Sequence, residues 1–274
     1  MSYLPHFLII GAMKAGTTSL YHYLNFHPEI SMSRIKETDF FCEKNFEKGL
    51  EWYTKMFPAN ARIKGEASTN YSKYPAETGV PERIYQTLPG VKIIYVLRDP
   101  INRLLSHVHH NLLKGDERED HYTEKLRNPE SHYVNCSRYY MQLEQYFPFF
   151  PKERILILTA EELRENTPDT MKKIFEFLNL NNADYHHSEY QKTRHISSGR
   201  RKILNPYLRR FLKNKPYYNF IASNLNFMIP TQVIPKPNPP DEVVGQLKSI
   251  FREDVKKLKS YTGRSFKEWH HDYD

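Results

Sequence analysis

The stretch FLIIGAMKAGTTSL, residues 7–20, decides the fold class of this chain. Four apolar residues precede Gly11, and a second glycine, Gly16, is followed by two threonines. This order predicts a buried strand that turns through a glycine-bounded loop into a helix. The backbone N–H groups of such a loop lie at the positive end of the helix dipole, where anions bind well. The stretch therefore predicts a phosphate-binding loop.

The lysine of this loop is not placed as in an ATP or GTP site. A Walker A loop reads G-x-x-x-x-G-K-[ST]. Gly11 and Gly16 have that spacing, but Thr17 stands where the lysine is required, and Lys14 precedes Gly16. A nucleotide kinase is therefore a weakened alternative. The loop by itself also leaves open a plain strand-to-helix turn with an exposed lysine.

Strands and helices alternate along the rest of the chain. VKIIYVLRD (91–99) is an almost continuous apolar run, which is typical of a parallel strand covered on both faces. Asp99 and Pro100 supply an N-cap and a first-turn proline for a helix over 100–113. We predict one α/β domain over 1–274, with a central, mostly parallel sheet flanked by helices and a P-loop-like nucleotide site. Further strands are expected within 61–66 and 154–163, and helices over 17–26, 80–89, 138–147, 167–180 and 241–263.

The composition is that of a soluble, basic, globular protein. Hydrophobic residues make up 39% and charged residues 26% of the 274 positions, and the net charge of +8 favours anionic partners. Two cysteines are too few for a disulfide framework. No apolar stretch approaches the roughly 20 residues that span a bilayer. We therefore expect a cytoplasmic protein without a membrane span.

One region keeps a non-enzymatic alternative open. RRKILNPYLRRFLKNK (200–215) is basic and contains aromatic residues, which suits a module that binds RNA or another polyanion. The competing interpretation is the solvated face of a helix. The surrounding segment 181–240 is irregular and rich in Asn, Pro, Lys and Tyr. We expect this segment to form a lid or substrate-binding region.

A second motif, VLRDPINRLLSHVHH (96–110), places basic and hydroxyl side chains at a strand end. Open α/β sheets bind ligands at the carboxyl ends of their strands. Arg98 ends the strand, while Arg103 and Ser106 follow three residues apart on one helix face. Arginine forks and a hydroxyl suit a dianion. The alternative is an Arg–Asp surface pair beside a helix N-cap.

A third motif, RIKETDFF (34–41), holds a candidate general base. Glu37 lies among basic residues and just before two phenylalanines, surroundings that suit a carboxylate that stays ionised. A surface loop of mixed charge is the alternative. Imidazole is also a suitable base at neutral pH, so His109 and His110 compete with Glu37 for this role.

Together the three motifs resemble those of the sulfotransferases that use 3′-phosphoadenosine 5′-phosphosulfate (PAPS). The likeness is greatest to the branch that contains bacterial sulfotransferases and the heparan sulfate sulfotransferase domains. It covers most of the chain and is weakest over 181–240. Other segments that carry it are GLEWYTKMFP (49–58), GEASTNY (65–71), SRYYMQLEQYFPFFP (137–151) and FREDVKKLKSYTGRSFKEW (251–269).

The resemblance implies a role for each motif. Glu37 occupies the position of the family's catalytic base. Arg98 and Ser106 would hold the 3′-phosphate, and the late loop HISSGRRK (195–202) would close over it. The loop residues that would bind the 5′-phosphosulfate are Lys14, Ala15, Gly16, Thr17 and Thr18. The candidates in the late loop are Ser198, Gly199, Arg200 and Arg201.

The implied reaction is in-line transfer of a sulfuryl group from PAPS to a hydroxyl, or to an amine, of a carbohydrate or small metabolite. Such transfer depends on positioning and charge stabilisation. Glu37 would accept the acceptor's proton, and Lys14 would neutralise charge as adenosine 3′,5′-bisphosphate (PAP) leaves. Because a sulfuryl group carries less charge than a phosphoryl group, we expect no metal ion. We expect no nucleic-acid partner.

The chain departs from the heparan 3-O-sulfotransferase pattern on the acceptor side. That pattern reads Glu-x-His-Phe-Phe-Asp, whereas this chain has Asp39 at the His position and Cys42 at the final Asp. Ala67 replaces a lysine in a later Glu-Lys-Thr. We expect Asp39 and Asn70 to contact the acceptor. The sequence identifies neither the acceptor nor the oligomeric state.

Overall fold

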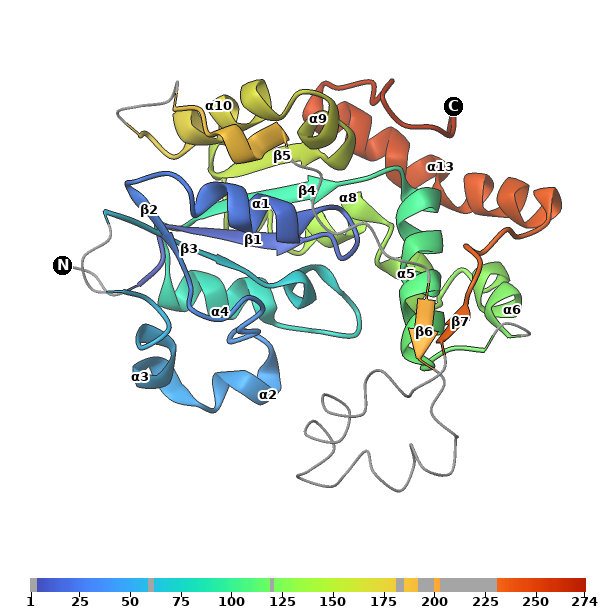
Figure 1. Ribbon diagram of the computed structural model, residues 1–274, viewed down its shortest axis with the longest axis horizontal. Coiled ribbons are helices and arrows are strands. Elements are labelled where there is room, and N and C mark those ends of the chain that lie inside the picture. Colours follow the sequence, from blue (N-terminus) through green and yellow to red (C-terminus); the bar gives the residue numbers. More distant parts are fainter. Residues whose placement is uncertain (1–3, 59–61, 119–120, 181–184, 192–199, 203–230) are drawn as a thin grey trace.

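The computed structural model describes residues 4–58, 62–118, 121–180, 185–191, 200–202 and 231–274. A five-stranded sheet runs through this part of the chain in the order β2-β3-β1-β4-β5, and every pair in it is parallel. The strands are β1 (Phe7–Gly11), β2 (Ile30–Met32), β3 (Ile63–Ala67), β4 (Lys92–Leu97) and β5 (Ile155–Thr159). The predicted α/β domain with a parallel sheet is confirmed (Figure 1).

Burial of the strands explains the apolar runs in the sequence. All five residues of β1 are buried, and so are five of the six residues of β4. A strand that is covered on both faces has no place for alternating polar residues. Helices line the sheet, as the ribbon shows for α1, α4, α9 and α10 (Figure 1).

The helices have the following bounds. They are α1 (Thr17–Leu24), α2 (Glu43–Phe46), α3 (Gly49–Thr54), α4 (Val80–Thr87), α5 (Pro100–Lys114), α6 (Tyr122–Arg127), α7 (His132–Asn135), α8 (Tyr139–Glu144), α9 (Ala160–Glu165), α10 (Thr167–Phe177) and α13 (Asp241–Thr262). Three short 3-10 turns are η1 (Thr69–Ser72), η2 (Lys152–Arg154) and η3 (Ser188–Gln191). None of the helices in the described residues is long and apolar enough to cross a membrane.

Within 181–240 the structure describes η3 and two short strands. β6 (Arg200–Lys202) and β7 (Thr231–Val233) pair antiparallel, apart from the main sheet. Most of the predicted lid segment, like most of the basic stretch 200–215, lies outside the described residues. The lid therefore stays a prediction.

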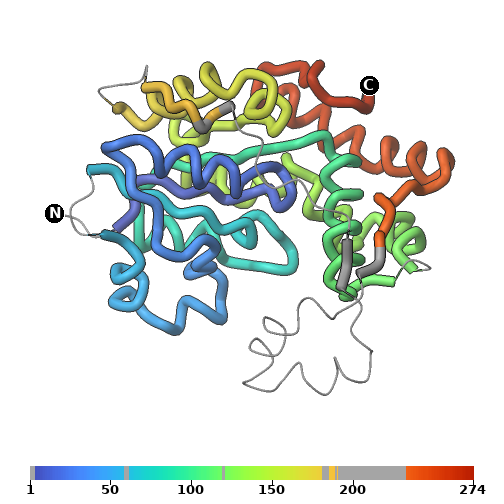
Figure 2. Tube along the Cα trace, in the orientation of Figure 1, coloured from blue at the N-terminus to red at the C-terminus, as the bar shows by residue number. Residues whose placement is uncertain are grey.

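The parallel sheet brings three strand ends to one edge. β1 lies between β3 and β4, so the loops after Gly11, Ala67 and Leu97 are neighbours. This edge is where open α/β sheets bind their ligands. The last described segment, after α13, also returns to the start of α5 (Figure 2).

Candidate active site

The loop after β1 has the geometry that its glycines predict. Gly16 is the N-cap of α1 with φ +87°, in the left-handed region that glycine adopts without strain. The first N–H groups of α1, from Thr17 onward, have no intrahelical acceptors. Thr17 and Ala15 are buried, whereas Lys14 and Thr18 are half-buried. The loop therefore presents backbone donors and one ammonium group in the same place.

Two arginines of the second motif reach the carbonyl groups of this loop. Arg98 Nη1 donates to Lys14 O at 3.2 Å, and Arg103 Nη1 donates to Met13 O at 3.4 Å. The structure thus joins two motifs that are some 80 residues apart in the sequence. Burial, followed by the nearby charges of Arg98, Lys114 and Arg103, lowers the pKa of Lys14. The positive charge here suits a polyanionic ligand.

Arg103, which the second motif places on the same helix face as Ser106, has contacts that the motif did not predict. Its side chain is fully buried, with Nε donating to Ser137 Oγ at 2.6 Å and Nη2 to Tyr133 O at 2.7 Å. Among the described residues, no carboxylate forms an ion pair with it. Because a buried charge without a counterion is costly, this guanidinium favours an anion next to the loop. The residues present therefore fit the phosphate groups of PAPS.

The histidines of α5 point to different surroundings. His109 is buried, and its Nε2 lies 3.0 Å from Ile234 O. His110 is half-buried and feels the charges of both Lys14 and Glu37. Burial, and then Lys14 and Lys114, lower the pKa of His110 to about 4. Of the two competing histidines, His110 therefore lies in the field of the candidate lysine and carboxylate. Ser106, one turn earlier, is half-buried.

The backbone of Glu37 is hydrogen-bonded to Ala67, the last residue of β3. Its N–H donates to Ala67 O at 2.9 Å, and its φ is +63°. The carboxylate is 38% exposed and contacts Lys36 Nζ at 2.5 Å, while Thr69 Oγ1 donates to Glu37 Oε1 at 3.4 Å. The carboxylate is thus solvent-accessible and positioned by neighbours on two sides.

The buried carboxylate of Glu66 is hydrogen-bonded to the loop that carries Glu37. It accepts hydrogen bonds from Thr38 Oγ1 at 2.5 Å, Ser68 Oγ at 2.6 Å, Tyr71 OH at 2.7 Å and Tyr53 OH. Burial raises the pKa of Glu66, and these four hydroxyl groups oppose that rise. The sequence placed Glu66 in a segment that resembles the family but did not predict its hydrogen bonds. The four hydroxyl partners come from three separate segments of the chain.

The predicted acceptor residues form a pair beside Glu37. Asn70 Nδ2 donates to Asp39 Oδ2 at 2.8 Å. The other oxygen, Asp39 Oδ1, is buried and has no hydrogen-bond partner among the described residues. Burial, and then the charges of Glu37 and Glu66, raise the pKa of Asp39 to about 6. Asp39 Oδ1 therefore has an unused hydrogen-bonding position.

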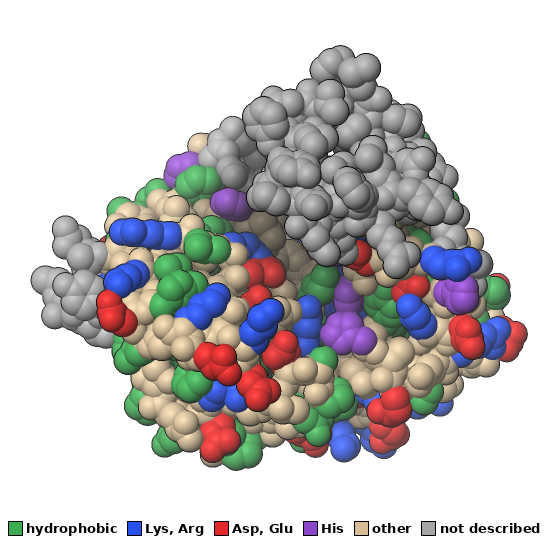
Figure 3. Space-filling model, turned by 90° about the horizontal axis from the view of Figure 1, so that it is seen from below, with side chains coloured by type: hydrophobic (Ala, Val, Ile, Leu, Met, Phe, Trp, Pro, Cys, Tyr) green, Lys and Arg blue, Asp and Glu red, His purple; other side chains and the backbone are tan. Residues whose placement is uncertain are grey.

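Two of the four late-loop candidates lie in β6. Ser198 and Gly199 lie outside the described residues, and Arg200 and Arg201 are described only as backbone of β6. In the part of the chain that the structure covers, no group of three or more His, Cys, Asp or Glu side chains is arranged to hold a metal ion. Figure 3 shows acidic, basic and histidine side chains interspersed around a hollow on one face.

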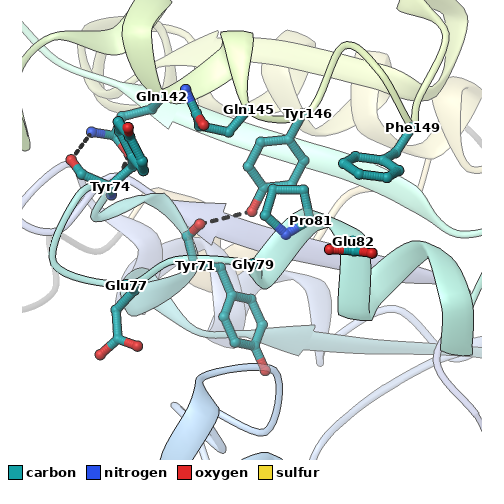
Figure 4. A pocket seen from close by; sticks show the side chains of 10 residues that line it. All are labelled: Tyr71, Tyr74, Glu77, Gly79, Pro81, Glu82, Gln142, Gln145, Tyr146 and Phe149. Atoms are coloured by element: carbon teal, nitrogen blue, oxygen red, sulfur yellow. Dashed lines mark hydrogen bonds between the residues drawn. The ribbon is translucent and has the colours of Figure 1, made fainter.

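A separate cavity of about 120 Å³ lies between η1, α4 and α8 (Figure 4). Tyr146 OH donates to Tyr71 O across it at 2.8 Å, and Gln142 is bonded to the backbone of Tyr74. Ligand pockets are usually 300–1,000 Å³, so this cavity is too small for a nucleotide. The candidate donor site lies instead at the carboxyl ends of β1, β3 and β4.

The loop, the β4–α5 junction and the parallel sheet together form an α/β domain with basic side chains at its strand ends. Residues 4–206 match the family model of the sulfotransferase domain. Because this match covers most of the chain, the protein belongs to the PAPS-dependent sulfotransferase family, as its motifs predicted. The members of this family are enzymes that take a sulfuryl group from PAPS.

Curated relatives match the same region. Human bifunctional heparan sulfate N-deacetylase/N-sulfotransferase 2 is 31% identical over 199 residues, which cover 65% of this chain and 22% of the relative. The Drosophila melanogaster bifunctional heparan sulfate N-deacetylase/N-sulfotransferase is 29% identical over 209 residues, covering 65% and 20%. The match thus spans about a fifth of the length of these relatives.

Solved structures share the fold. A sulfotransferase from Alicyclobacillus acidocaldarius has a TM-score of 0.69 at 22% identity, over 98% of this chain and 99% of that one. A sulfotransferase from Mycobacterium avium has a TM-score of 0.51 at 12% identity, over 94% and 77%. At these identities the likeness establishes the architecture.

Proposed function

We propose that this protein moves the sulfuryl group of PAPS to a hydroxyl, or to an amine, of a carbohydrate or small metabolite. The observation that carries the proposal is the hydrogen bond from Arg98 to the carbonyl of Lys14, because it joins the two donor motifs. The fully buried charge of Arg103, which has no ion-pair partner among the described residues, adds positive potential to the same place. A cytoplasmic location stays a prediction from the cysteine content.

The donor would bind across these two motifs. The N–H groups at the start of α1 and the side chain of Lys14 suit the 5′-phosphosulfate, since a helix N-terminus attracts anions. Arg98 and Ser106 would hold the 3′-phosphate from the β4–α5 junction. Ser198, Gly199, Arg200 and Arg201 remain the predicted late-loop contacts.

The transfer reaction uses Glu37 as the base and Lys14 as the cation. PAPS supplies the sulfuryl group, whose bond to the bridging oxygen breaks as PAP leaves. Glu37 accepts the proton from the acceptor O–H or N–H, which frees the acceptor lone pair to bond to sulfur. Lys14 stabilises the negative charge that develops on the bridging oxygen, and its lowered pKa favours proton donation there.

Asp39 and Asn70 would orient the acceptor. Asp39 Oδ1, which has no hydrogen-bond partner among the described residues, would accept a hydrogen bond from an O–H or N–H group beside Glu37. Two matched relatives are named N-sulfotransferases, which supports the amine as an acceptor. The carboxylates of Glu37 and Asp39 also favour a group that is positively charged before it loses its proton.

A calorimetric titration tests the donor assignment. We expect PAP to bind the purified protein at least tenfold more tightly than ATP with magnesium, because the loop lacks the lysine of a Walker A site. Lys14→Ala is expected to weaken PAP binding, whereas Lys55→Ala, an exposed lysine on the α3 side, serves as a matched control. Preference for ATP would support the kinase alternative. Indifference to both, with salt-dependent polyanion binding that survives Lys14→Ala, would support the non-enzymatic one.

A further inference from the structure

The junction that carries Arg98 is closed by residues from the far end of the described chain. Asp99 follows Arg98 and is fully buried. Its carboxylate accepts from the N–H of Asn102 at 2.8 Å, which makes Asp99 the N-cap of α5. It also accepts from the N–H of His271 at 2.8 Å and lies 3.0 Å from His271 Nδ1. Because an ionised carboxylate only accepts, Nδ1 carries the proton.

Tyr273 completes the cap of the same helix. Its hydroxyl accepts from the N–H of Ile101 at 3.2 Å and donates to Asp99 Oδ1 at 3.3 Å. The N–H of Ile101 is in the first turn of α5 and has no acceptor within the helix. Tyr273 is itself buried. One hydroxyl from another segment therefore satisfies a backbone group next to the candidate 3′-phosphate site.

Tyr139 of α8 supports the backbone of Arg98 and packs against Trp269. Tyr139 OH donates to Arg98 O at 2.7 Å. The rings of Tyr139 and Trp269 are 6.1 Å apart, and so are those of Trp269 and Tyr273. Aromatic packing at such distances fixes relative positions. Residues 269–273 thus contact the junction directly at Asp99 and indirectly through Tyr139.

The negative charge of Asp99 also affects the electrostatic potential around Arg98. An ionised carboxylate beside Arg98 lowers the positive potential that a phosphate meets. Burial alone raises the pKa of Asp99, but hydrogen bonds from the His271 ring and from the N–H groups of Asn102 and His271 lower it overall. Asp99 therefore stays ionised, and its carboxylate accepts hydrogen bonds from Asn102 in α5 and from His271 and Tyr273.

We propose that His271 and Tyr273 are positioning residues of the donor site. They fix Asp99 and the first turn of α5, and therefore the backbone from which Arg98 reaches the donor loop and Ser106 faces the 3′-phosphate. This inference rests on the proposed function, because it takes Arg98 and Ser106 as donor contacts. In this role His271 and Tyr273 act through Asp99 and the first turn of α5.

Tyr273→Phe tests the proposal, because it keeps the ring and removes one hydroxyl. We expect PAP affinity and the KM for PAPS to worsen by about three- to tenfold, as for the loss of one or two hydrogen bonds, while kcat changes less than twofold. Tyr261→Phe is the matched control, since the Tyr261 hydroxyl is buried without a hydrogen-bond partner among the described residues. The control should bind PAP as the unmodified protein does.

A second pair of variants separates positioning from folding. His271→Ala should weaken PAP binding, and His271→Asn, which keeps a side-chain N–H donor, should restore most of it. Titrations are made at least 15 °C below each variant's Tm. Normal PAP affinity in both Tyr273→Phe and His271→Ala would overturn the inference.

Arg98→Ala distinguishes this inference from the proposed function. If Arg98→Ala weakens PAP binding while the variants at 271 and 273 bind normally, the donor site stands and the positioning role is wrong. If Arg98→Ala leaves PAP affinity unchanged, the proposed donor site is wrong, and the positioning role is overturned with it.

Discussion

At the scale of single residues, backbone strain marks the candidate site. Five non-glycine residues in the described chain have positive φ, and three of them are Lys14, Glu37 and Asp39. Such conformations cost about 1–3 kcal/mol each and persist where the surroundings enforce them. For Glu37 and Asp39 the surroundings are the Glu66 network and the Ala67 carbonyl. The protein thus holds its lysine and two carboxylates in fixed, unfavourable backbone geometry.

Glu37→Gln should abolish transfer and leave donor binding intact. The amide keeps the size of the side chain but cannot accept a proton, and a general base contributes about 10²–10⁴-fold to the rate. We expect kcat to fall by about that factor in an assay with labelled PAPS, with PAP affinity within twofold of normal. Glu43→Gln is the control, a carboxylate change on nearby α2. Near-normal turnover would instead assign the base to His110 or His109.

At the scale of elements, local signals predicted the long segments and missed the contacts between them. The helix expected over 100–113 is α5, because Asp99 and Pro100 define its start. The strand expected within 154–163 ends at Thr159, because Thr159 and Glu162 form a capping box that begins α9. The sequence alone predicted the Lys14 and Arg98 motifs. The Glu66 network, the Arg103–Met13 contact and the Asp99–His271 pair were not predicted, because each joins distant segments.

Gly65→Ala should destabilise the sheet without touching the site chemistry. Gly65 of β3 pairs with Phe7 of β1, and a Cβ at Gly65 would lie 2.0 Å from the buried Phe7 ring. Overpacking of this kind costs about 1–3 kcal/mol. We expect urea unfolding to show that loss of unfolding free energy. Gly245→Ala is the control of opposite sign, because nothing lies within 4 Å of its Cβ and alanine favours the α13 helix. Equal stability of the two variants would contradict this account.

At the scale of the whole molecule, stability against pH sums opposing groups. Burial, and then the charge of Arg103, lower the pKa of His107 far below its usual 6.5. Burial also raises the pKa of Asp39 and of Asp254 to about 6. As pH falls below 6.5, an unfolded chain protonates His107 while the native chain does not, so this histidine lowers stability. The two aspartates act in the opposite direction between about pH 6 and 4.

Comparison with His107→Gln isolates the histidine, because the aspartates are common to both proteins. Near pH 8, well above the pKa of 6.5 in the unfolded chain, the stability difference between the two should be constant. Between pH 8 and 5 the unmodified protein should lose about 2 kcal/mol relative to the variant, most of it below pH 6.5, since one proton gives about 1.4 kcal/mol per pH unit. Urea unfolding at pH 8, 6.5 and 5 measures this difference. Parallel stability curves would show that His107 titrates normally in the native protein.

The contact between Asp99 and residues 271–273 affects the order in which the protein folds during its synthesis. A ribosome makes the donor loop among the first residues of this chain and the partners of Asp99 among the last that are described. A nascent chain that has exposed the whole parallel sheet still lacks His271, which donates to Asp99, and Tyr273, whose hydroxyl accepts from the N–H of Ile101 in α5. Contacts between such distant residues form slowly because a long loop must close first. During synthesis, therefore, the ability to hold the donor arises later than the sheet that carries it.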